Sequence, residues 1–350
     1  MEYRVLGRTG VKLSPLILGS DTFGDATPAD EAEQIINRAL DAGINMIDSG
    51  DVYAEGMSET IIGATIKARG SRDQVILGTK VDHGRRRVGV SLDEAVPGVG
   101  ANESGHSRLN VIRACENSLR RLQTDYIDLY QLHRPTFDIP LDETLRAMDD
   151  LVTQGKVRYI GCSTQPAWLV MEGLMVSQLK GYVGYVSEQP PYNLLDRRIE
   201  NELVPMCQRH GLGIIAWGAL GMGVLAGVYN SSTDYPSTSK AAKRGGFYAD
   251  RVNNRGIAVA QEFGKIATRL GLSGAQLANL WCKDQPGITA PLIGARTLAH
   301  LEDVLPVLEM TLDDETRAAC DELVPPGTAV ANFHNTAYWM KTKIADTPAP

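Results

Sequence analysis

Four side chains with complementary acid–base chemistry follow short apolar runs in the first half of the chain. Asp48 and His133 each come directly after such a run, Lys80 follows a run that ends at Leu77, and Tyr53 lies five positions beyond Asp48. In a parallel barrel the carboxyl ends of all strands meet at one face, and active sites are built there. If these runs are neighbouring strands, we expect the four side chains to converge on one pocket.

Together the four residues suit the reduction of a carbonyl group. The phenol of Tyr53 has an ordinary pKa of about 10, and a nearby ammonium such as Lys80 lowers that pKa by favouring the phenolate. Asp48 would keep Lys80 charged and oriented, and a neutral His133 would donate a hydrogen bond to the carbonyl oxygen. The hydride has to come from a cofactor, because no side chain supplies one.

Each residue taken alone also has an ordinary structural explanation. An aspartate after a strand is often a helix cap, a tyrosine packs, a lysine is solvated, and a single histidine is more often structural than catalytic. The four positions together, at matching strand ends and in sequence order, favour an active site. No Cys or His pair has the spacing of zinc ligands, so we expect no metal.

Short apolar runs bounded by turn residues alternate along the chain with longer segments of helical period. Strands are expected at residues 16–18, 45–47, 74–77, 126–132, 157–160, 185–187, 213–217 and near 290–293. Helices are expected around residues 31–42, 58–68, 109–122, 141–154, 165–178, 197–210, 259–270, 273–284 and 298–308, with Ser273 as an N-cap. A hairpin of residues 3–6 and 11–13 precedes them.

About eight consecutive strand–helix units are the number that closes a parallel barrel. A doubly wound open sheet would instead show G-x-G-x-x-G after its first strand, and residues 19–24 lack that spacing. We therefore predict an α/β fold, a (β/α)8 TIM barrel, as a single domain over residues 1–350 with an N-terminal β-hairpin and long C-terminal-face loops.

Three long stretches, residues 81–107, 227–256 and the segment from Pro325 onward, are expected to be irregular. Loops of this length in a compact fold are often lids or binding loops. We expect the 324–350 tail, with Phe333, Tyr338 and Trp339, to pack near the active-site face. Asp21 and Phe23 would join these stretches as walls of a substrate pocket.

Composition narrows the class of protein. The chain has 350 residues, of which 43% are hydrophobic, and a net charge of −7, which argues against nucleic-acid binding. It shows no signal peptide and no run of roughly 18 apolar residues, so we expect a cytoplasmic protein without a membrane span. The five scattered cysteines are expected to be reduced core residues. The expected partner is a small-molecule carbonyl substrate, and the sequence makes no prediction of oligomeric state.

Several motifs together resemble the aldo-keto reductases over about residues 3–310. They are Tyr-Arg-Val-Leu-Gly-Arg-Thr-Gly at 3–10, Gly-Ile-Asn-Met-Ile-Asp-Ser-Gly-Asp-Val-Tyr at 43–53, Gly-Thr-Lys at 78–80, Asp-Tyr-Ile-Asp-Leu-Tyr-Gln-Leu-His at 125–133 and Gly-Lys-Val-Arg-Tyr-Ile-Gly-Cys-Ser at 155–163. The resemblance implies that Asp48, Tyr53, Lys80 and His133 are catalytic. It also implies a barrel that binds NAD(P)H without a Rossmann domain.

The resemblance also implies a cofactor site along the later strand ends. Residues that would hold the nicotinamide, the pyrophosphate and the adenosine phosphate are Ser163, Thr164, Gln189, Trp217, Gly218, Leu220, Gly223, Gly294, Arg296 and Asp303. Trp217 would stack on the nicotinamide ring, and the forked guanidinium of Arg296 would meet a 2′-phosphate, which favours NADPH over NADH. The chain departs from the family at Thr164, where Asn is common, and at Ser49-Gly50, where Thr-Ala is common.

The function implied is an NADPH-dependent oxidoreductase that reduces an aldehyde or ketone to an alcohol, with Tyr53 as proton donor. The long loops favour a larger substrate, such as a ketone on a sugar or a polycyclic natural product. Two alternatives stay open. One is a cofactor-binding regulatory subunit of the same fold with little turnover, and the other is a different barrel enzyme, such as a phosphosugar isomerase, without nicotinamide affinity.

Overall fold

The computed structural model describes residues 1–81 and 102–334. The strands are β1 Arg4–Val5, β2 Lys12–Leu13, β3 Ile17–Gly19, β4 Met46–Asp48, β5 Ile76–Val81, β6 Ile127–Leu132, β7 Val157–Ser163, β8 Ser187–Gln189, β9 Gly213–Ala216 and β10 Ala290–Ile293. Strands β3 to β10 pair in chain order, all in parallel, and β10 closes on β3. The predicted closed parallel barrel and antiparallel hairpin are confirmed.

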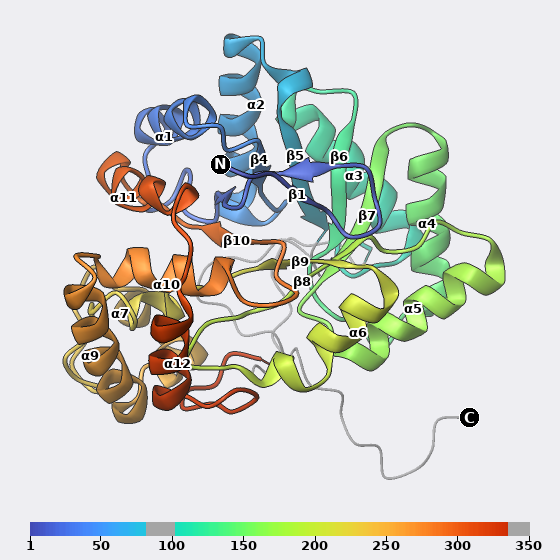
Figure 1. Ribbon diagram of the computed structural model, residues 1–350. Helices are drawn as coiled ribbons and strands as arrows, with labels where there is room; N and C mark the ends of the chain where they lie inside the picture. Colours follow the sequence, from blue (N-terminus) through green and yellow to red (C-terminus); the bar gives the residue numbers. More distant parts are fainter. Residues whose placement is uncertain (82–101, 335–350) are drawn as a thin grey trace.

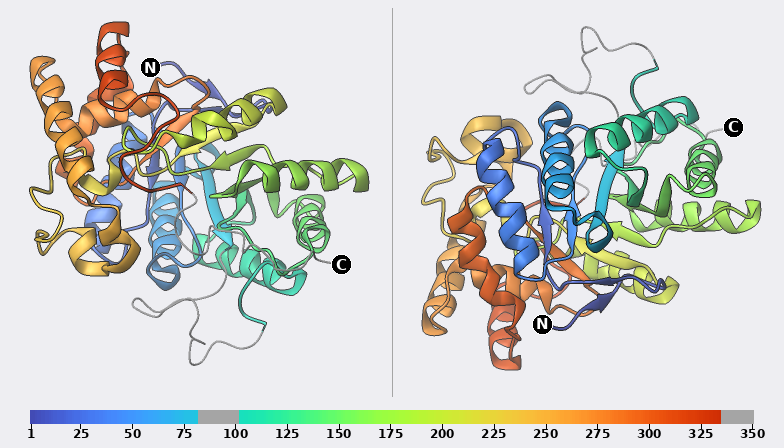
Figure 2. Two further views of the ribbon diagram at one scale, coloured as in Figure 1. Left: turned by 90° about the horizontal axis from the view of Figure 1, so that it is seen from below. Right: turned by 90° about the horizontal axis from the view of Figure 1, so that it is seen from above.

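Helices surround the central strands (Figures 1 and 2). They are α1 Ala29–Asp41, α2 Met57–Arg69, α3 Arg108–Leu122, α4 Leu141–Thr153, α5 Ala167–Lys180, α6 Leu203–His210, α7 Lys240–Arg244, α8 Gly246–Asp250, α9 Asn254–Arg269, α10 Gly274–Lys283, α11 Leu298–Val304 and α12 Asp314–Leu323. Ser273 caps α10 as predicted, in a capping box with Gln276.

Two predicted helices are shorter than expected. The helix predicted at 197–210 is a 3-10 turn over Arg198–Asn201 followed by α6. Helix α6 begins at Leu203, and Pro205 lies in its first turn, where proline is tolerated. The helix predicted at 298–308 ends at Val304 because Pro306 removes a backbone donor, and a 3-10 turn over Leu305–Leu308 follows.

Three helices lie where none was predicted. The stretch 227–256 was expected to be irregular but contains α7, whose N-cap Ser239 accepts from Ala242 N, and α8. Helix α12 begins after Asp313, whose side chain accepts from Thr316 N. Both starts are local capping signals that the apolar periodicity alone does not reveal.

The hairpin closes one end of the barrel. It crosses in front of the strands in Figure 1 and lies at one end of them in the turned views of Figure 2. A backbone hydrogen bond from Arg8 N to Gly211 O (2.8 Å) joins the hairpin to the residue pair that precedes β9. A separate apolar cluster fills the barrel interior at this end. Its buried members are Leu6, Leu13, Ile17, Met46, Leu129, Val186, Ile215 and Ala290.

The next layer of the barrel interior is polar because strand side chains alternate with a period of two. Met46 and Leu129 belong to the apolar cluster, and Asp48 and Gln131 lie two positions further along the same strands. Both polar side chains are fully buried. The hairpin end of the barrel interior is therefore filled with apolar side chains, and the polar side chains lie in the next layer along the barrel axis.

Hydrogen bonds hold the last described segment, residues 328–334, to the loop after β8. The Asp196 carboxylate accepts from Phe333 N (2.6 Å) and His334 N (2.8 Å), and Leu195 O accepts from Val330 N (2.9 Å). The Phe333 side chain is fully buried. Tyr338 and Trp339 lie outside the described residues.

The five cysteines are buried free thiols, as predicted. Within residues 1–81 and 102–334, no group of His, Cys, Asp or Glu side chains is arranged to hold a metal ion. No helix in this part of the chain has both the length and the apolar character needed to span a membrane.

Candidate active site

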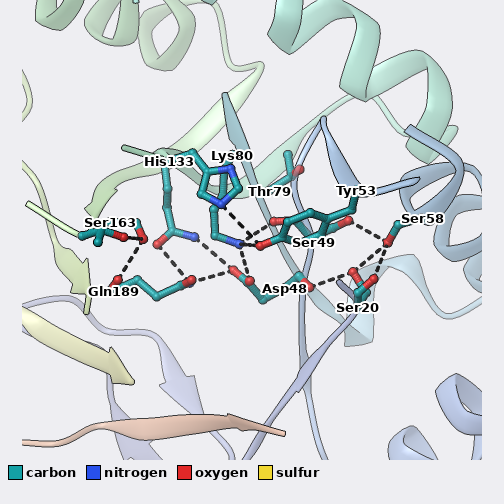
Figure 3. A network of polar contacts seen from close by, with 12 residues as sticks. Ser20, Asp48, Ser49, Tyr53, Ser58, Thr79, Lys80, His133, Ser163 and Gln189 are labelled. Atoms are coloured by element: carbon teal, nitrogen blue, oxygen red, sulfur yellow. Dashed lines mark hydrogen bonds and ion pairs between the residues drawn. The ribbon is translucent and has the colours of Figure 1, made fainter. Parts of the chain in front are cut away.

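The four predicted catalytic side chains meet at one end of the barrel interior (Figure 3). Lys80 Nζ lies 3.3 Å from Tyr53 Oη, and His133 Nε2 lies 3.4 Å from the same oxygen. Lys80 also forms a buried ion pair with Asp48 Oδ2 and donates to Ser49 O (2.6 Å). Lys80 lies within β5 instead of following its strand, because β5 extends to Val81.

Asp48 uses both of its carboxylate oxygens. While Oδ2 pairs with Lys80, Oδ1 accepts from Gln189 Nε2 (2.9 Å) and from Gln131 Nε2 (3.1 Å). Gln131 was not singled out from the sequence, although its place on β6 two residues before His133, which directly follows that strand, is the signal for it. The network fixes the carboxylate and therefore the direction of the ammonium.

The electrostatics of Tyr53 differ from the expectation. Burial raises the pKa of Tyr53 to about 12, and this exceeds the lowering by the Lys80 ammonium, while Asp48 raises the pKa further. Burial alone would lower the pKa of Lys80, but the Asp48 carboxylate outweighs it and raises that pKa above its usual value. The phenol is thus a neutral acid and the amine a cation at physiological pH.

The backbone around Tyr53 is shaped to bring the phenol over Lys80. Tyr53 opens a 3-10 turn in which Ala54 and Glu55 have φ angles of 47° and 56°, a left-handed conformation that side chains disfavour. A Cβ atom at Gly50 would lie 3.3 Å from the phenol ring and 3.4 Å from His133 Cε1. The glycine in the Ser49-Gly50 departure therefore gives the phenol room.

The turn after β7 places the residues predicted to hold the carboxamide. Ser163 Oγ donates to Gln189 O (2.8 Å), and Thr164 N donates to the same carbonyl (3.2 Å). None of the described residues donates to the amide oxygen of Gln189, whose nitrogen is held by Asp48. Ser163, Thr164 and Gln189 thus lie together. Figure 3 shows Ser163 and Gln189 beside the network around Asp48 and Lys80.

Trp217 lies just beyond β9 and is partly exposed, at the start of a glycine-rich loop. Gly218, Gly221 and Gly223 have φ angles of 76°, 54° and 94°, which only glycine adopts without strain. Together with Leu220 they form a tight backbone turn.

A buried arginine lies against the Trp217 indole. The Arg251 guanidinium lies 5.5 Å from the Trp217 ring centroid and 5.0 Å from the Phe333 ring centroid. Burial lowers the pKa of Arg251 to about 10. The guanidinium therefore links the indole to the C-terminal segment through cation–π contacts.

The predicted adenosine end of the site lies around β10 and α11. Gly294 is exposed, and its Cα faces Asp21, with 3.9 Å between an added Cβ and the carboxylate. Arg296 Nη1 donates to Thr238 O (3.0 Å), and the carboxylate of Asp303 accepts from Ser273 Oγ (2.8 Å). Asp303 therefore joins α10 to α11 in this structure.

Glu31 is an unpredicted acidic neighbour at this end. Its Oε1 accepts from the first backbone N–H of α11, that of Leu298, at 2.5 Å. An anion bound at this helix start would meet the Glu31 carboxylate, so Glu31 opposes the cationic contribution of Arg296.

The structure places the two residues predicted to line the substrate pocket, Asp21 and Phe23, in different surroundings. The Asp21 carboxylate forms an ion pair with Lys240 Nζ (2.5 Å) across the mouth of the barrel, which ties the loop after β3 to α7. The Phe23 side chain is fully buried in the hydrophobic core, so its place in a substrate pocket stays a prediction. The proposed wall at 81–107 falls mostly outside the described residues.

Comparison with known proteins gives a consistent family. The aldo/keto reductase family model matches residues 15–325. The chain is 35% identical over 334 residues to "Uncharacterized oxidoreductase YrpG" of Bacillus subtilis (strain 168), covering 93% of this chain and 97% of the relative.

Two plant relatives carry a different description. The chain is 33% identical over 321 residues to a "Probable voltage-gated potassium channel subunit beta" of Arabidopsis thaliana, covering 88% of this chain and 93% of that one. It is 33% identical over 331 residues to a protein of the same name from Oryza sativa subsp. japonica, covering 91% and 96%. The chain belongs to the aldo/keto reductase family of oxidoreductases.

Proposed function

We propose that the protein uses NADPH to reduce an aldehyde or ketone to the alcohol, with Tyr53 as the proton donor. The observation that carries the proposal is the position of Tyr53 Oη, 3.3 Å from Lys80 Nζ and 3.4 Å from His133 Nε2. A neutral phenol between a buried cation and an imidazole suits proton donation to an oxygen that gains negative charge.

The residues around the site fit a nicotinamide cofactor. Trp217 offers a partly exposed aromatic face, and the amide oxygen of Gln189 receives no hydrogen bond from the described residues. The glycine-rich backbone from Gly218 to Gly223 allows close approach of a pyrophosphate. NADPH bound here would supply the hydride to the carbonyl carbon.

The proton chemistry falls to the chain itself. Tyr53 Oη would give its proton to the carbonyl oxygen, and Lys80 would stabilise the phenolate left behind. His133, in the tautomer that carries hydrogen on Nε2, would donate a hydrogen bond to the same carbonyl oxygen. Asp48 balances the charge of Lys80 and holds it in place through the ion pair. Hydride on carbon and proton on oxygen together give the alcohol.

The reaction is tested by measuring NADPH oxidation with a panel of aldehydes and ketones that includes sugar and polycyclic ketones. We expect turnover with at least one class, and the long stretch 227–256 and the fastened tail favour the larger compounds. NADPH binding without oxidation by any member of a broad panel would contradict the proposed reaction.

The plant relatives favour a second candidate function, a cofactor-binding regulatory subunit with little turnover. It predicts tight NADPH binding and negligible carbonyl reduction in the same panel. A different barrel enzyme, such as a phosphosugar isomerase, would bind no nicotinamide, so a direct binding measurement together with the turnover panel separates the three functions.

A further inference from the structure

A carboxylic acid is buried on the outer side of the barrel wall beneath the predicted carboxamide site. Glu188 lies on β8 between Ser187 and Gln189, and its side chain is 0% exposed. Because strand side chains alternate, Gln189 faces the barrel interior while Glu188 faces away from it. Its neighbour on β7 is Cys162.

The Glu188 carboxylate supports the turn that follows β7. Its Oε1 accepts from Gln165 N at 3.0 Å. Two more hydrogen bonds join this turn to β8, from Thr164 N (3.2 Å) and Ser163 Oγ (2.8 Å) to Gln189 O. Residues 163–165 are therefore held to β8 by one carboxylate and one carbonyl.

The turn needs this support because its backbone is strained. Thr164 has a φ angle of 60°, and a β-branched residue in the left-handed region is an outlier that costs roughly 1–3 kcal/mol. Such a conformation persists only where neighbouring groups enforce it. The contact from Gln165 N to Glu188 directly follows the strained residue.

Burial of the Glu188 carboxylate costs free energy because the group loses its hydration. Its Oε2 has no hydrogen-bond partner, and no Lys or Arg in the described part of the chain forms an ion pair with it. Burial raises the pKa values of Cys162, Tyr185 and Cys207, and the charge of Glu188 raises them further; none of these three groups is a cation. A packed apolar residue would avoid the desolvation cost but could not accept the Gln165 N–H.

We propose that Glu188 is a positioning residue of the cofactor site. By accepting from Gln165 N, it holds Thr164 in the left-handed conformation and so presents Ser163 and Gln189 to the nicotinamide carboxamide. The proposal rests on the proposed function only in that the ligand is a nicotinamide cofactor.

The test measures the NADPH dissociation constant by fluorescence, with thermal stability measured in parallel. Glu188→Ala removes the acceptor, and we expect affinity to weaken by about tenfold, which corresponds to about 1.4 kcal/mol. Glu188→Gln keeps an acceptor oxygen and should recover most of the affinity. In turnover assays, KM for NADPH should rise in Glu188→Ala while kcat at saturating NADPH changes less than about twofold.

Two further variants separate positioning from general stability. Thr164→Gly removes the strain, so adding it to Glu188→Ala should restore at least part of the affinity. Asp284→Ala removes a mostly buried carboxylate that accepts from Leu312 N (2.9 Å), outside the active-site network, and should lower stability without changing NADPH affinity.

Several results would overturn the proposal. They are unchanged affinity in a folded Glu188→Ala protein, or an equal loss in Glu188→Ala with and without Thr164→Gly. Absence of nicotinamide binding by the unmodified protein would overturn it together with the proposed function. Binding without carbonyl turnover would remove only the proposed reaction and leave the affinity comparison intact.

Discussion

The Asp48 carboxylate serves two purposes at the centre of the site. One oxygen pairs with Lys80, and the other receives amide hydrogens from Gln131 and Gln189, so the carboxylate cannot turn away from the amine. The buried ion pair survives because its remaining lone pairs are satisfied. The cation under the phenol is thus fixed before any substrate arrives.

Replacing the phenol tests its role as proton donor directly. We expect Tyr53→Phe to lower kcat for carbonyl reduction by about 10²–10⁴-fold, the range for loss of a general acid, with NADPH affinity retained. Steady-state NADPH oxidation and fluorescence titration check the two parts. Unchanged turnover would remove Tyr53 from the mechanism.

The pH dependence of reduction follows from the pKa of Tyr53 of about 12. If Tyr53 is the proton donor, as proposed, its active form is the protonated phenol, which is present below that pKa. We therefore expect kcat/KM for reduction to stay flat from about pH 7.5 to 10 and to fall only above that range. A loss of activity centred near pH 8 would show that another group donates the proton. Rate measurements in constant-ionic-strength buffers distinguish these outcomes.

If NADPH binds as proposed, two opposed charges at the start of α11 influence the preference between NADPH and NADH. We expect Arg296→Ala to weaken NADPH binding more than NADH binding, and Glu31→Gln to strengthen NADPH binding by a few-fold, because it removes a carboxylate beside the phosphate position. Titrations with both cofactors check this. Equal changes for NADPH and NADH would contradict a 2′-phosphate contact.

At the residue scale, much of the site was predictable. Asp48, Tyr53, Lys80 and His133 could be found because a barrel brings successive strand ends together. The direction of the Tyr53 pKa shift could not, because it depends on how deeply the phenol is buried. Glu31 could not be found either, since its contact crosses 267 positions of sequence.

Helices α2 and α3 approach closely at one glycine. A Cβ atom at Gly63 would lie 2.5 Å from the carbonyl group of Leu122 and 2.6 Å from Arg121 O, all backbone atoms that cannot move aside. Helix α2 follows β4, which carries Asp48, and α3 packs against β5, which carries Lys80. The spacing of this pair therefore depends on the absence of a side chain.

We expect Gly63→Ala to destabilise the protein by about 1–3 kcal/mol through overpacking. Gly264→Ala is a matched control, because Gly264 is also helical, in α9, and has nothing within 4 Å of an added Cβ. That change should be neutral or stabilise by up to about 1 kcal/mol. Urea unfolding of both variants checks the difference, and equal effects would show that the α2–α3 contact can relax.

Element prediction succeeded where apolar period and tertiary packing agree. The eight barrel strands and the helices α1 to α5 lie close to their predicted positions. Helices α7, α8 and α12 were missed because caps at Ser239 and Asp313 define two of them, and their apolar stripes are short. The turn at Thr164 was beyond prediction, since a threonine gives no sequence signal of a positive φ angle.

The two ends of the described chain stabilise different parts of the barrel. The hairpin residues Leu6 and Leu13 fill the bottom of the interior, while Phe333 packs beside Arg251 next to the Trp217 indole. The barrel architecture itself was predictable from the count of strand–helix units together with the missing G-x-G-x-x-G spacing after the first strand. The fastening of residues 328–334 by Asp196 was not, because it joins distant segments through backbone donors.

We expect Phe333→Ala to lower stability by about 3–5 kcal/mol, as for a fully buried aromatic side chain, and to release the segment from Asp196. Phe137→Ala is the control, because Phe137 is 41% exposed and should cost little. Denaturant unfolding and the rate of limited proteolysis within residues 325–334 measure both effects. Equal sensitivity of the two variants would show that the segment contributes nothing to the fold.

The candidate catalytic side chains and the loop at the barrel mouth come from separate parts of the chain, which has a practical consequence for protein engineering. Asp48, Lys80 and Gln131 belong to β4, β5 and β6, whereas the stretch 227–256 reaches the mouth of the barrel from beyond β9 and is tied there by Lys240. A recombination library that exchanges this stretch between homologues, with position 240 retained, should change which compounds are accepted while leaving the acidity of the phenol as it is.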